Sequence, residues 1–180
     1  MVLAGPTAVG KGTIVRRLVE RYGDVWVSVS VTTREARPGE REGVDYYFVS
    51  EDRFDQMVSD DELLEWAVVH GEHRYGTPRA AVLRHLHAGF RCILEIDIAG
   101  ARQVRASAPD ALFVFIAPPS WEELVRRLEL RGTEDEDERT RRLATARMEM
   151  AAADEFEHVI VNDDLDTAVD AVHALLVGER

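Results

Sequence analysis

A glycine-rich segment near the start of the chain has the residue types of a phosphate-binding loop. Gly5 and Gly10 enclose four residues, and Lys11 follows directly, between a short apolar run and an amphipathic stretch. Small residues let backbone N–H groups turn toward phosphate oxygens, and the N-terminus of a following helix adds partial positive charge. The spacing therefore predicts a phosphate-binding loop between a strand and a helix. The predicted loop comprises Gly5, Pro6, Thr7, Ala8, Val9, Gly10, Lys11, Gly12 and Thr13.

Lys11 is the single lysine among the 22 Lys and Arg residues, all others being arginine. Chance could place a lone lysine anywhere, but the surrounding glycines favour a role in the loop. A lysine has a compact ammonium on a thin stem, which suits a crowded site better than the broad guanidinium of arginine. Position 12 is glycine where phosphate loops usually carry a Ser or Thr that ligates magnesium, so Thr13 is the nearest hydroxyl.

Composition limits the classes of partner. The 180 residues are enough for one domain with a proper core. The net charge of −12 argues against a generic nucleic-acid or anionic-membrane binder. A single cysteine, Cys92, excludes an intrachain disulfide and is expected to be a buried thiol. The sequence shows no signal peptide or membrane-spanning run, so we expect a cytoplasmic protein.

Apolar, β-branched runs alternate with amphipathic segments, which predicts an α/β fold with a mainly parallel sheet. Thr77 with Pro78 is typical of a helix start, as is the Ser120/Glu123 capping box, and Gly89 and Gly132 are typical of helix ends. The region from 32 to 77 breaks the alternation and is expected to be an inserted substrate-binding lobe. Strands are expected near Val2–Ala4, Val25–Val31, Arg91–Ile96, Ala111–Ala117 and His158–Val161.

The loop GPTAVGKGT and the segment SVSVTTREARPGEREGVDYYFV that follows it resemble the guanylate kinase family, as do LLEWA, RYGTP, CILEIDIAG, FIAPPS, RLELRGTE and IVND. The similarity runs over nearly the whole chain in the family's order. It implies a P-loop NTPase three-layer fold in one domain, 1–180, with a core of 1–31 and 78–180. It also implies a GMP-binding lobe at about 32–77, a helical lid at about 131–148, and ATP-dependent phosphorylation of GMP to GDP.

The same resemblance implies residues that bind GMP. Arg34 and Arg37 resemble the clamp on the GMP phosphate, because guanidinium forks suit a dianion. Glu65 resembles the residue that reads guanine, since a carboxylate accepts hydrogen bonds from guanine N1–H and its amine but repels the N1 acceptor of adenine. The remaining implied contacts with GMP are Ser30, Tyr46, Tyr75, Thr77 and Asp97. For Asp97, ordering of magnesium-bound water is the alternative role.

For transfer, the resemblance implies Lys11, Arg131 and Arg142 around the moving phosphoryl group, with no nucleophilic residue and therefore no covalent intermediate. Asn162 falls where the family approaches the adenine of ATP. The expected cofactor is Mg²⁺, bound as MgATP and held mostly through water. No histidine or cysteine pattern indicates a protein metal site.

Two alternatives stay open. One is a guanylate-kinase-like module that binds phosphorylated peptides without ATP chemistry, against which Gly10, Lys11, Arg131 and Arg142 argue. The other is a related small P-loop kinase acting on AMP, dTMP or a sugar phosphate, against which Glu65 and the TTREAR segment argue. The expected partners are ATP and GMP, with dGMP as an alternative acceptor, and neither nucleic acid nor membrane. The sequence does not determine the oligomeric state.

Overall fold

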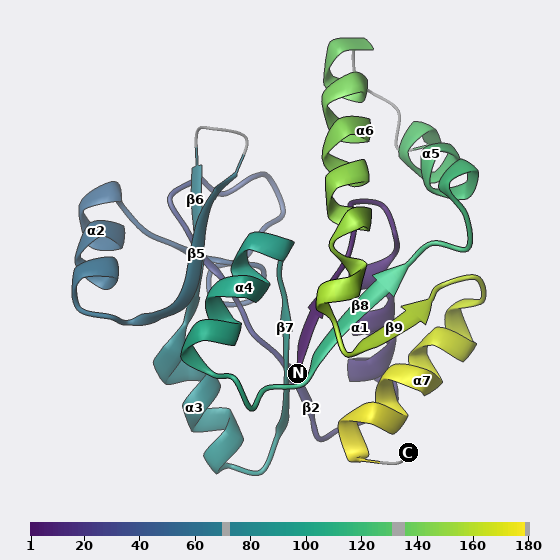
Figure 1. Cartoon of the computed structure of the whole chain (residues 1–180). Coiled ribbons are helices and arrows are strands. Elements are labelled where there is room, and N and C mark those ends of the chain that lie inside the picture. Colours follow the sequence, from purple (N-terminus) through teal and green to yellow (C-terminus); the bar gives the residue numbers. More distant parts are fainter. Residues whose placement is uncertain (70–72, 131–135, 179–180) are drawn as a thin grey trace. The chain divides into compact units, whose positions relative to one another are not determined.

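The computed structural model describes residues 1–69, 73–130 and 136–178 (Figure 1). The chain forms two compact units. Unit 1 comprises Met1–Gly23, Glu95–Ile98 and Leu112–Arg180, and unit 2 comprises Asp24–Leu94 and Ala99–Ala111.

Unit 1 is built on three parallel strands in the order β1-β8-β9, with Leu3 paired to Val114 and Val114 paired to His158. Every residue of β8 is buried. Such a continuous apolar run is typical of a strand covered on both faces. The strands are β1 (Val2–Ala4), β8 (Phe113–Ala117) and β9 (His158–Val161), and the helices are α1 (Lys11–Arg21), α5 (Trp121–Leu130), α6 (Glu136–Ala151), the short 3-10 turn η1 (Ala153–Glu155) and α7 (Leu165–Val177).

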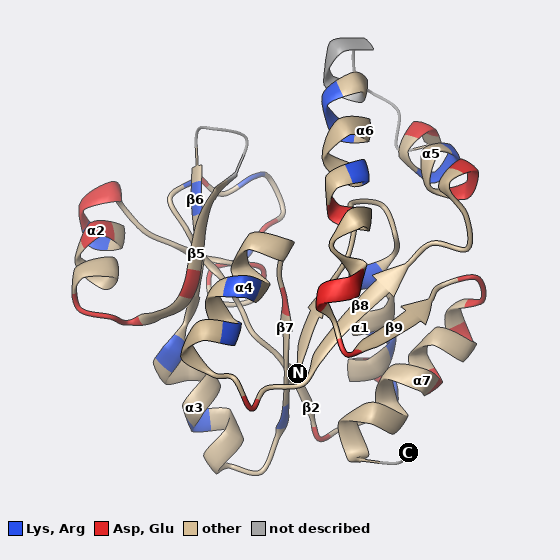
Figure 2. Cartoon of the chain, viewed as in Figure 1, with Lys and Arg blue, Asp and Glu red and all other residues tan. Residues whose placement is uncertain are grey.

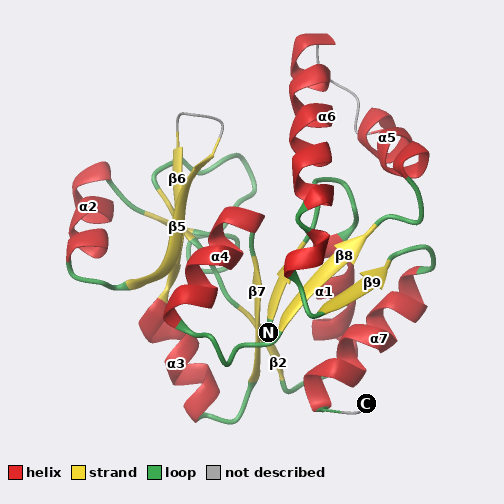
Figure 3. Ribbon diagram, in the orientation of Figure 1, coloured by secondary structure: helices red, strands yellow, loops and turns green. Residues whose placement is uncertain are grey.

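Helices α1 and α7 of unit 1 lie side by side (Figure 3). Ile14 and Leu18 of α1 are fully buried, as are Val169 and Val172 of α7. Their spacing of three or four residues places each pair on one helix face. The side chain of Asp164 accepts a hydrogen bond from the Thr167 N–H at 2.9 Å and so caps the start of α7.

Unit 2 combines a parallel strand pair, β2 with β7, and a mixed sheet in the order β4-β3-β6-β5. In the mixed sheet β3 is parallel to β4 and antiparallel to β6, which is antiparallel to β5. The strands are β2 (Val25–Val27), β3 (Val31–Thr32), β4 (Tyr47–Phe48), β5 (Leu63–Val69), β6 (His73–Pro78) and β7 (Arg91–Glu95), and the helices are α2 (Glu51–Ser59), α3 (Arg79–His87) and α4 (Ile98–Ser107).

The mixed sheet and α2 enclose a small core of Val31, Phe54, Met57 and Leu63. The Phe54 ring meets the Trp66 ring edge-on, with centroids 6.2 Å apart. This core gives the mixed sheet and α2 an apolar interior of their own.

The single strand predicted for Val25–Val31 is wrong. The chain leaves β2 after Val27 and enters β3 at Val31, so the two ends of the predicted strand belong to different sheets. The segment VWVSVSV keeps apolar residues at every other position through the change of sheet, and hydrophobicity alone does not reveal a change of partner.

The predicted helix signals have mixed outcomes. Gly89 has a φ of +86° just after the C-cap of α3, as predicted. The cap predicted at Thr77 is wrong, because α3 begins at Arg79 and Thr77 lies in β6. Ser120 accepts a hydrogen bond from the Glu123 N–H at 3.2 Å, as a capping box requires, but the Glu123 carboxylate binds arginines further along α5. Gly132 lies outside the described residues.

These elements confirm the predicted α/β class with mainly parallel strands and an additional mixed sheet. Cys92 is a buried free thiol, as predicted, and burial raises its pKa. Within the described part of the chain, no helix combines the length and apolar character needed to cross a membrane.

Candidate active site

Two glycines of the predicted phosphate loop allow close approaches that no other residue would permit. Gly5 has a φ of +145°, and a Cβ there would lie 2.3 Å from the carbonyl oxygen of Ile116 in β8. Gly10, the N-cap of α1, has a φ of +100°, and a Cβ there would lie 2.5 Å from Nδ2 of Asn162. Both positions therefore need glycine for conformation and for space.

The loop ends in a helix start that can hold an anion. The N–H groups of Thr13 and Ile14 both donate to the Gly10 carbonyl at 3.0 Å. The N–H groups of Gly10 and Gly12 precede the first helical hydrogen bonds. At this end of a helix, the N–H groups have no acceptor within the helix itself. Together with the helix dipole, this arrangement favours a bound phosphate.

Lys11 lies along the loop as predicted. Its Nζ donates to the carbonyl oxygens of Gly5 at 2.6 Å and Pro6 at 3.1 Å. The ammonium thus lies against the loop, where it can meet a phosphate by exchanging one of these carbonyls.

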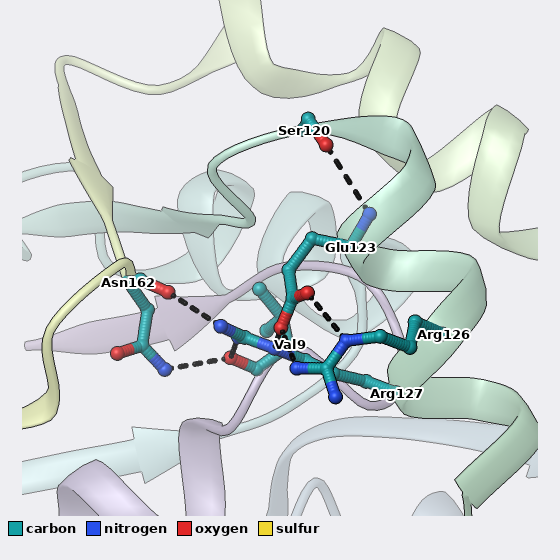
Figure 4. A network of polar contacts seen from close by, with 6 residues as sticks. All are labelled: Val9, Ser120, Glu123, Arg126, Arg127 and Asn162. Atoms are coloured by element: carbon teal, nitrogen blue, oxygen red, sulfur yellow. Dashed lines mark hydrogen bonds and ion pairs between the residues drawn. The ribbon is translucent and has the colours of Figure 1, made fainter.

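A polar network supports the loop from behind (Figure 4). The carbonyl of fully buried Val9 accepts hydrogen bonds from Nδ2 of Asn162 at 2.8 Å and from Arg127 at 3.3 Å. Arg127 also donates to the Asn162 carbonyl at 3.1 Å and to Glu123 at 2.7 Å. The Asn162 side chain, expected at the adenine of ATP, is 6% exposed and holds the loop with its amide. Sequence reasoning missed Arg127, because a single arginine on an amphipathic helix gives no sign of this contact.

Three carboxylates surround the loop, and only Asp97 was predicted. Glu149 of α6 accepts a hydrogen bond from the Thr7 N–H at 3.1 Å. Burial raises the pKa of Glu149, and nearby Asp97 raises it further, whereas Thr7 and Lys11 lower it. Glu95, at the end of β7, has carboxylate oxygens 3.5 and 3.7 Å from where a Cβ on Gly12 would stand.

In unit 2, the structure brings together three of the residues predicted to bind the GMP phosphate. Arg34 is buried, and its Nε donates to the Tyr75 hydroxyl at 3.1 Å. The guanidinium carbon lies 5.3 Å from the centre of the Tyr46 ring, which meets the Tyr75 ring edge-on. Arg37 is on the adjacent turn, where its side chain is exposed.

The fork of Arg34 is engaged by a residue that the sequence did not reveal. Glu40 accepts from both terminal nitrogens of Arg34, at 2.8 and 3.0 Å, and from the Arg37 N–H at 2.8 Å. Arg34 also donates to the Glu35 carbonyl at 2.7 Å. The hydrogen bond with Arg34 lowers the pKa of Glu40. Among the contacts of the described residues, all but one of the N–H donors of Arg34 are therefore engaged.

The residues predicted to read the base form a second buried group in unit 2. Glu65 of β5 and Thr77 of β6 are both buried, and the Thr77 hydroxyl donates to Glu65 at 2.6 Å. Ser30 lies directly before β3, where its carbonyl accepts from the Tyr47 N–H at 2.9 Å. Asp97 lies in unit 1 with the phosphate loop.

The predicted lid arginines are only half described. Arg142 lies on α6 and is partly exposed, whereas Arg131 lies outside the described residues. Within the described ranges, no group of three or more His, Cys, Asp or Glu side chains is arranged to hold a metal ion.

Comparison with known proteins gives one consistent result. Residues 1–179 match the family model described as guanylate kinase. The guanylate kinase of Thermobifida fusca is 57% identical over 98% of this chain and 90% of its own length, and that of Corynebacterium diphtheriae is 52% identical over 100% and 95%.

Solved structures agree. A guanylate kinase crystal structure from Anaplasma phagocytophilum has a TM-score of 0.78 and 35% identity, covering 99% of this chain and 84% of that one. A shikimate kinase from Bacteroides thetaiotaomicron, at 15% identity and a TM-score of 0.51 over 98% and 96% of the two chains, shares the fold alone.

The network behind the loop predicts a specific pH dependence. Hydrogen bonds from Arg126 and Arg127 lower the pKa of Glu123 from 4.5 to about 2. A carboxyl group whose pKa is depressed by folding stabilises the folded state above the unfolded pKa, and this contribution is lost as the pH falls through the folded pKa. The stability difference between wild type and Glu123→Gln should therefore be constant above pH ~5 and shrink toward pH ~2.

Urea unfolding between these pH values measures the difference. Glu20→Gln on α1, where the carboxylate is 53% exposed and 3.6 Å from Arg17, is the matched control for loss of a helix-surface carboxylate beside an arginine. A Glu123→Gln difference that did not change with pH would contradict the role of this ion pair.

Proposed function

The chain belongs to the guanylate kinase family, and we propose that it transfers the γ-phosphoryl group of ATP to GMP through the two groups of residues described above. The observation that carries this proposal is the coexistence of an intact Gly10–Lys11 phosphate loop with a buried carboxylate, Glu65, suited to guanine. The phosphate loop supplies the chemistry of a kinase, and Glu65 selects the acceptor.

The loop from Gly5 to Thr13 binds the ATP phosphates in this proposal. The start of α1 supplies backbone donors, and Lys11 supplies the positive charge for the outer phosphates. Asn162 and Arg127 fix the loop through Val9, so the donors are oriented before ATP arrives. We keep Asn162 as a candidate contact of the adenine, although its amide already has a structural partner.

The turn from Arg34 to Glu40 binds the GMP phosphate. Because Glu40 holds the fork of Arg34, that arginine offers its remaining N–H together with its charge, and exposed Arg37 provides an open guanidinium. The hydroxyls of Tyr46 and Tyr75 complete the phosphate site. Glu40 thus joins the predicted set as the residue that orients the clamp.

Glu65 reads the base. The Thr77 hydroxyl donates to one of its oxygens, and a carboxylate, which has about four lone-pair sites, can also accept from guanine N1–H and the exocyclic amine. A buried carboxylate opposite the N1 acceptor of adenine would be left without a donor, so AMP is disfavoured. Ser30 and Asp97 are the further base-side candidates, and dGMP remains an alternative acceptor.

Transfer requires alignment and positive charge rather than a nucleophilic residue. An oxygen of the GMP phosphate attacks the γ-phosphorus in line, a P–O bond to GMP forms, the bond to the β–γ bridging oxygen breaks, and ADP leaves with the electron pair. Lys11, Arg131 and Arg142 neutralise the charge on the moving group. We keep the GMP-binding lobe at about 32–77 and the helical lid at about 131–148 as proposed parts of one catalytic domain, 1–180.

The residues around Gly12 fit a magnesium ion carried in with ATP. Glycine offers no hydroxyl, but the Glu95 carboxylate lies beside it, and Thr13 follows in the chain. Oxygen donors of this kind, together with Asp97, suit Mg²⁺ and its retained waters. When bound, the ion neutralises charge on the β- and γ-phosphates.

The alternatives predict different assays. A phosphopeptide-binding module would not turn over ATP, and a kinase for AMP, dTMP or a sugar phosphate would prefer that acceptor. We propose a cytoplasmic enzyme that does not bind nucleic acid, in line with the net charge of −12.

The deciding experiment measures ADP release by the purified protein with MgATP and GMP, dGMP, AMP, dTMP or no acceptor. GMP should give the highest kcat/KM. ATP binding without GMP-dependent ADP release would contradict the proposal, and the acceptor that is turned over would identify the alternative kinase.

Lys11→Arg should lower kcat about 100-fold although the charge is kept, because a guanidinium cannot occupy the position 2.6 Å from the Gly5 carbonyl and still leave room for phosphate. Arg21→Lys, near the exposed end of α1 where Arg21 pairs with Asp170, is the matched swap and should leave kcat unchanged. Wild-type turnover in Lys11→Arg would show that charge alone is required.

Glu65→Gln should lower the ratio of kcat/KM for GMP over AMP by about 10–100-fold, since one acceptor of a buried charged hydrogen bond becomes a donor. Glu62→Gln, three residues away and paired with Arg53, removes the same charge and should leave the ratio unchanged. An unchanged ratio in Glu65→Gln would place guanine recognition elsewhere.

A further inference from the structure

The carboxylate of Glu149 contacts the phosphate loop although Glu149 lies on α6, far from the loop in the sequence. Its Oε2 accepts the hydrogen bond from the Thr7 N–H across 142 residues, within unit 1. Thr7 is the third residue of the loop, so α6 and the loop are joined directly, with no intervening residue.

The start of the loop is held from two sides. Lys11 binds the carbonyl oxygens of Gly5 and Pro6, and Glu149 binds the N–H of Thr7. One cation and one carboxylate thus fix consecutive peptide groups. The hydrogen bond between Glu149 and Thr7 therefore fixes the position of α6 relative to these peptide groups.

The C-terminal half of α6 has further anchors. Ala146 is fully buried, and the guanidinium of Arg147 lies 5.0 Å from the centre of the Trp121 ring on α5. Figure 2 shows basic residues (blue) along α6 and an acidic residue (red) near its C-terminal end. Glu149 is the member of this half that contacts the loop.

Arg142 precedes Glu149 by seven residues on the same helix. Seven residues are close to two turns, so the two side chains lie within about 20° of one face and about 10 Å apart along the axis. Fixing Glu149 on Thr7 therefore sets both the rotation and the height of Arg142 with respect to the loop.

We propose that Glu149 is a positioning residue for phosphoryl transfer, whose hydrogen bond to Thr7 holds α6 in register so that Arg142 is aimed at the phosphoryl group bound in the loop. This inference rests on the proposed function, because it takes Arg142 as a contact of the transferring group. A carboxylate beside the ATP phosphates repels them, so Glu149 does not serve ATP affinity. Glu149 affects the alignment of Arg142 with the transferring phosphoryl group, so its loss should lower kcat.

Two substitutions separate the hydrogen bond from the charge. Glu149→Ala removes the acceptor and should lower kcat about 100-fold, the effect expected of a displacement near 1 Å, with the KM for MgATP unchanged or lower. Glu149→Gln keeps an oxygen that can accept from the Thr7 N–H, and should stay within about tenfold of the wild-type kcat. Asp154→Asn, which removes an exposed carboxylate five residues further along the chain, is the control and should match the wild type.

A double-mutant cycle with Arg142→Ala tests whether Glu149 acts through Arg142. Arg142→Ala alone should lower kcat by about a thousand-fold. In that background, Glu149→Ala should cost less than about threefold more, because the residue it positions is gone. If thermal unfolding shows that Glu149→Ala does not fold, the same cycle is run with Glu149→Gln. The smaller loss of kcat caused by Glu149→Gln should likewise disappear in the Arg142→Ala background.

The inference would be overturned if Glu149→Ala lowered kcat by the same factor in the wild type and in the Arg142→Ala background. A glutamine variant as impaired as the alanine variant would also overturn it, as would a raised KM for MgATP with unchanged kcat. A wild-type protein inactive with GMP would instead refute the proposed function, whereas an active wild type with an additive cycle refutes only the role of Glu149.

Discussion

Both candidate phosphate sites consist of hydrogen-bond donors, and such donors need acceptors whenever no phosphate is bound. The protein meets this requirement with its own carboxylates. In unit 2, Glu40 binds the fork of Arg34, and in unit 1, Glu149 accepts from the Thr7 N–H. Two carboxylates of this acidic chain thus accept hydrogen bonds from donors of the two candidate phosphate sites.

The phosphate loop also depends on two positions where the surrounding atoms lie too close to leave room for a side chain. Gly5 passes so near the Ile116 carbonyl, and Gly10 so near Asn162, that any Cβ would force the loop away. Val9 is then fixed by the Asn162 amide and by Arg127. Rigid support of this kind lets the loop present its donors with little reorganisation, which is the main requirement of electrostatic catalysis.

What the sequence could predict was local. The spacing of Gly5, Gly10 and Lys11 is set by the backbone of one turn, so the loop and its flanking strand and helix were predictable. Tyr75 and Arg34 were also predicted as neighbours, but only through resemblance to a family. The chain passes from one sheet to another between Val27 and Val31, and the sequence did not predict this change. Apolar residues do not specify which strand they pair with.

The residues that hold the sites could not be found in this way. Glu149 and Arg127 reach the loop through contacts between segments more than a hundred residues apart, and Glu123 holds Arg127 from four residues earlier on α5. Nothing in their local pattern differs from an ordinary charged helix face. Glu40 lies only six residues from Arg34, yet its return to that guanidinium depends on the fold of the turn. Local sequence patterns thus indicate candidate substrate-binding residues more readily than the residues that hold them in place.

The most direct test of preorganisation by internal carboxylates is a crystal structure with GMP bound. The account predicts that Glu40 still accepts from both terminal nitrogens of Arg34, and that the phosphate of GMP takes the remaining N–H of Arg34 together with Arg37 and the tyrosine hydroxyls. A Glu40 carboxylate displaced from Arg34, with the phosphate gripped by the vacated fork, would contradict it.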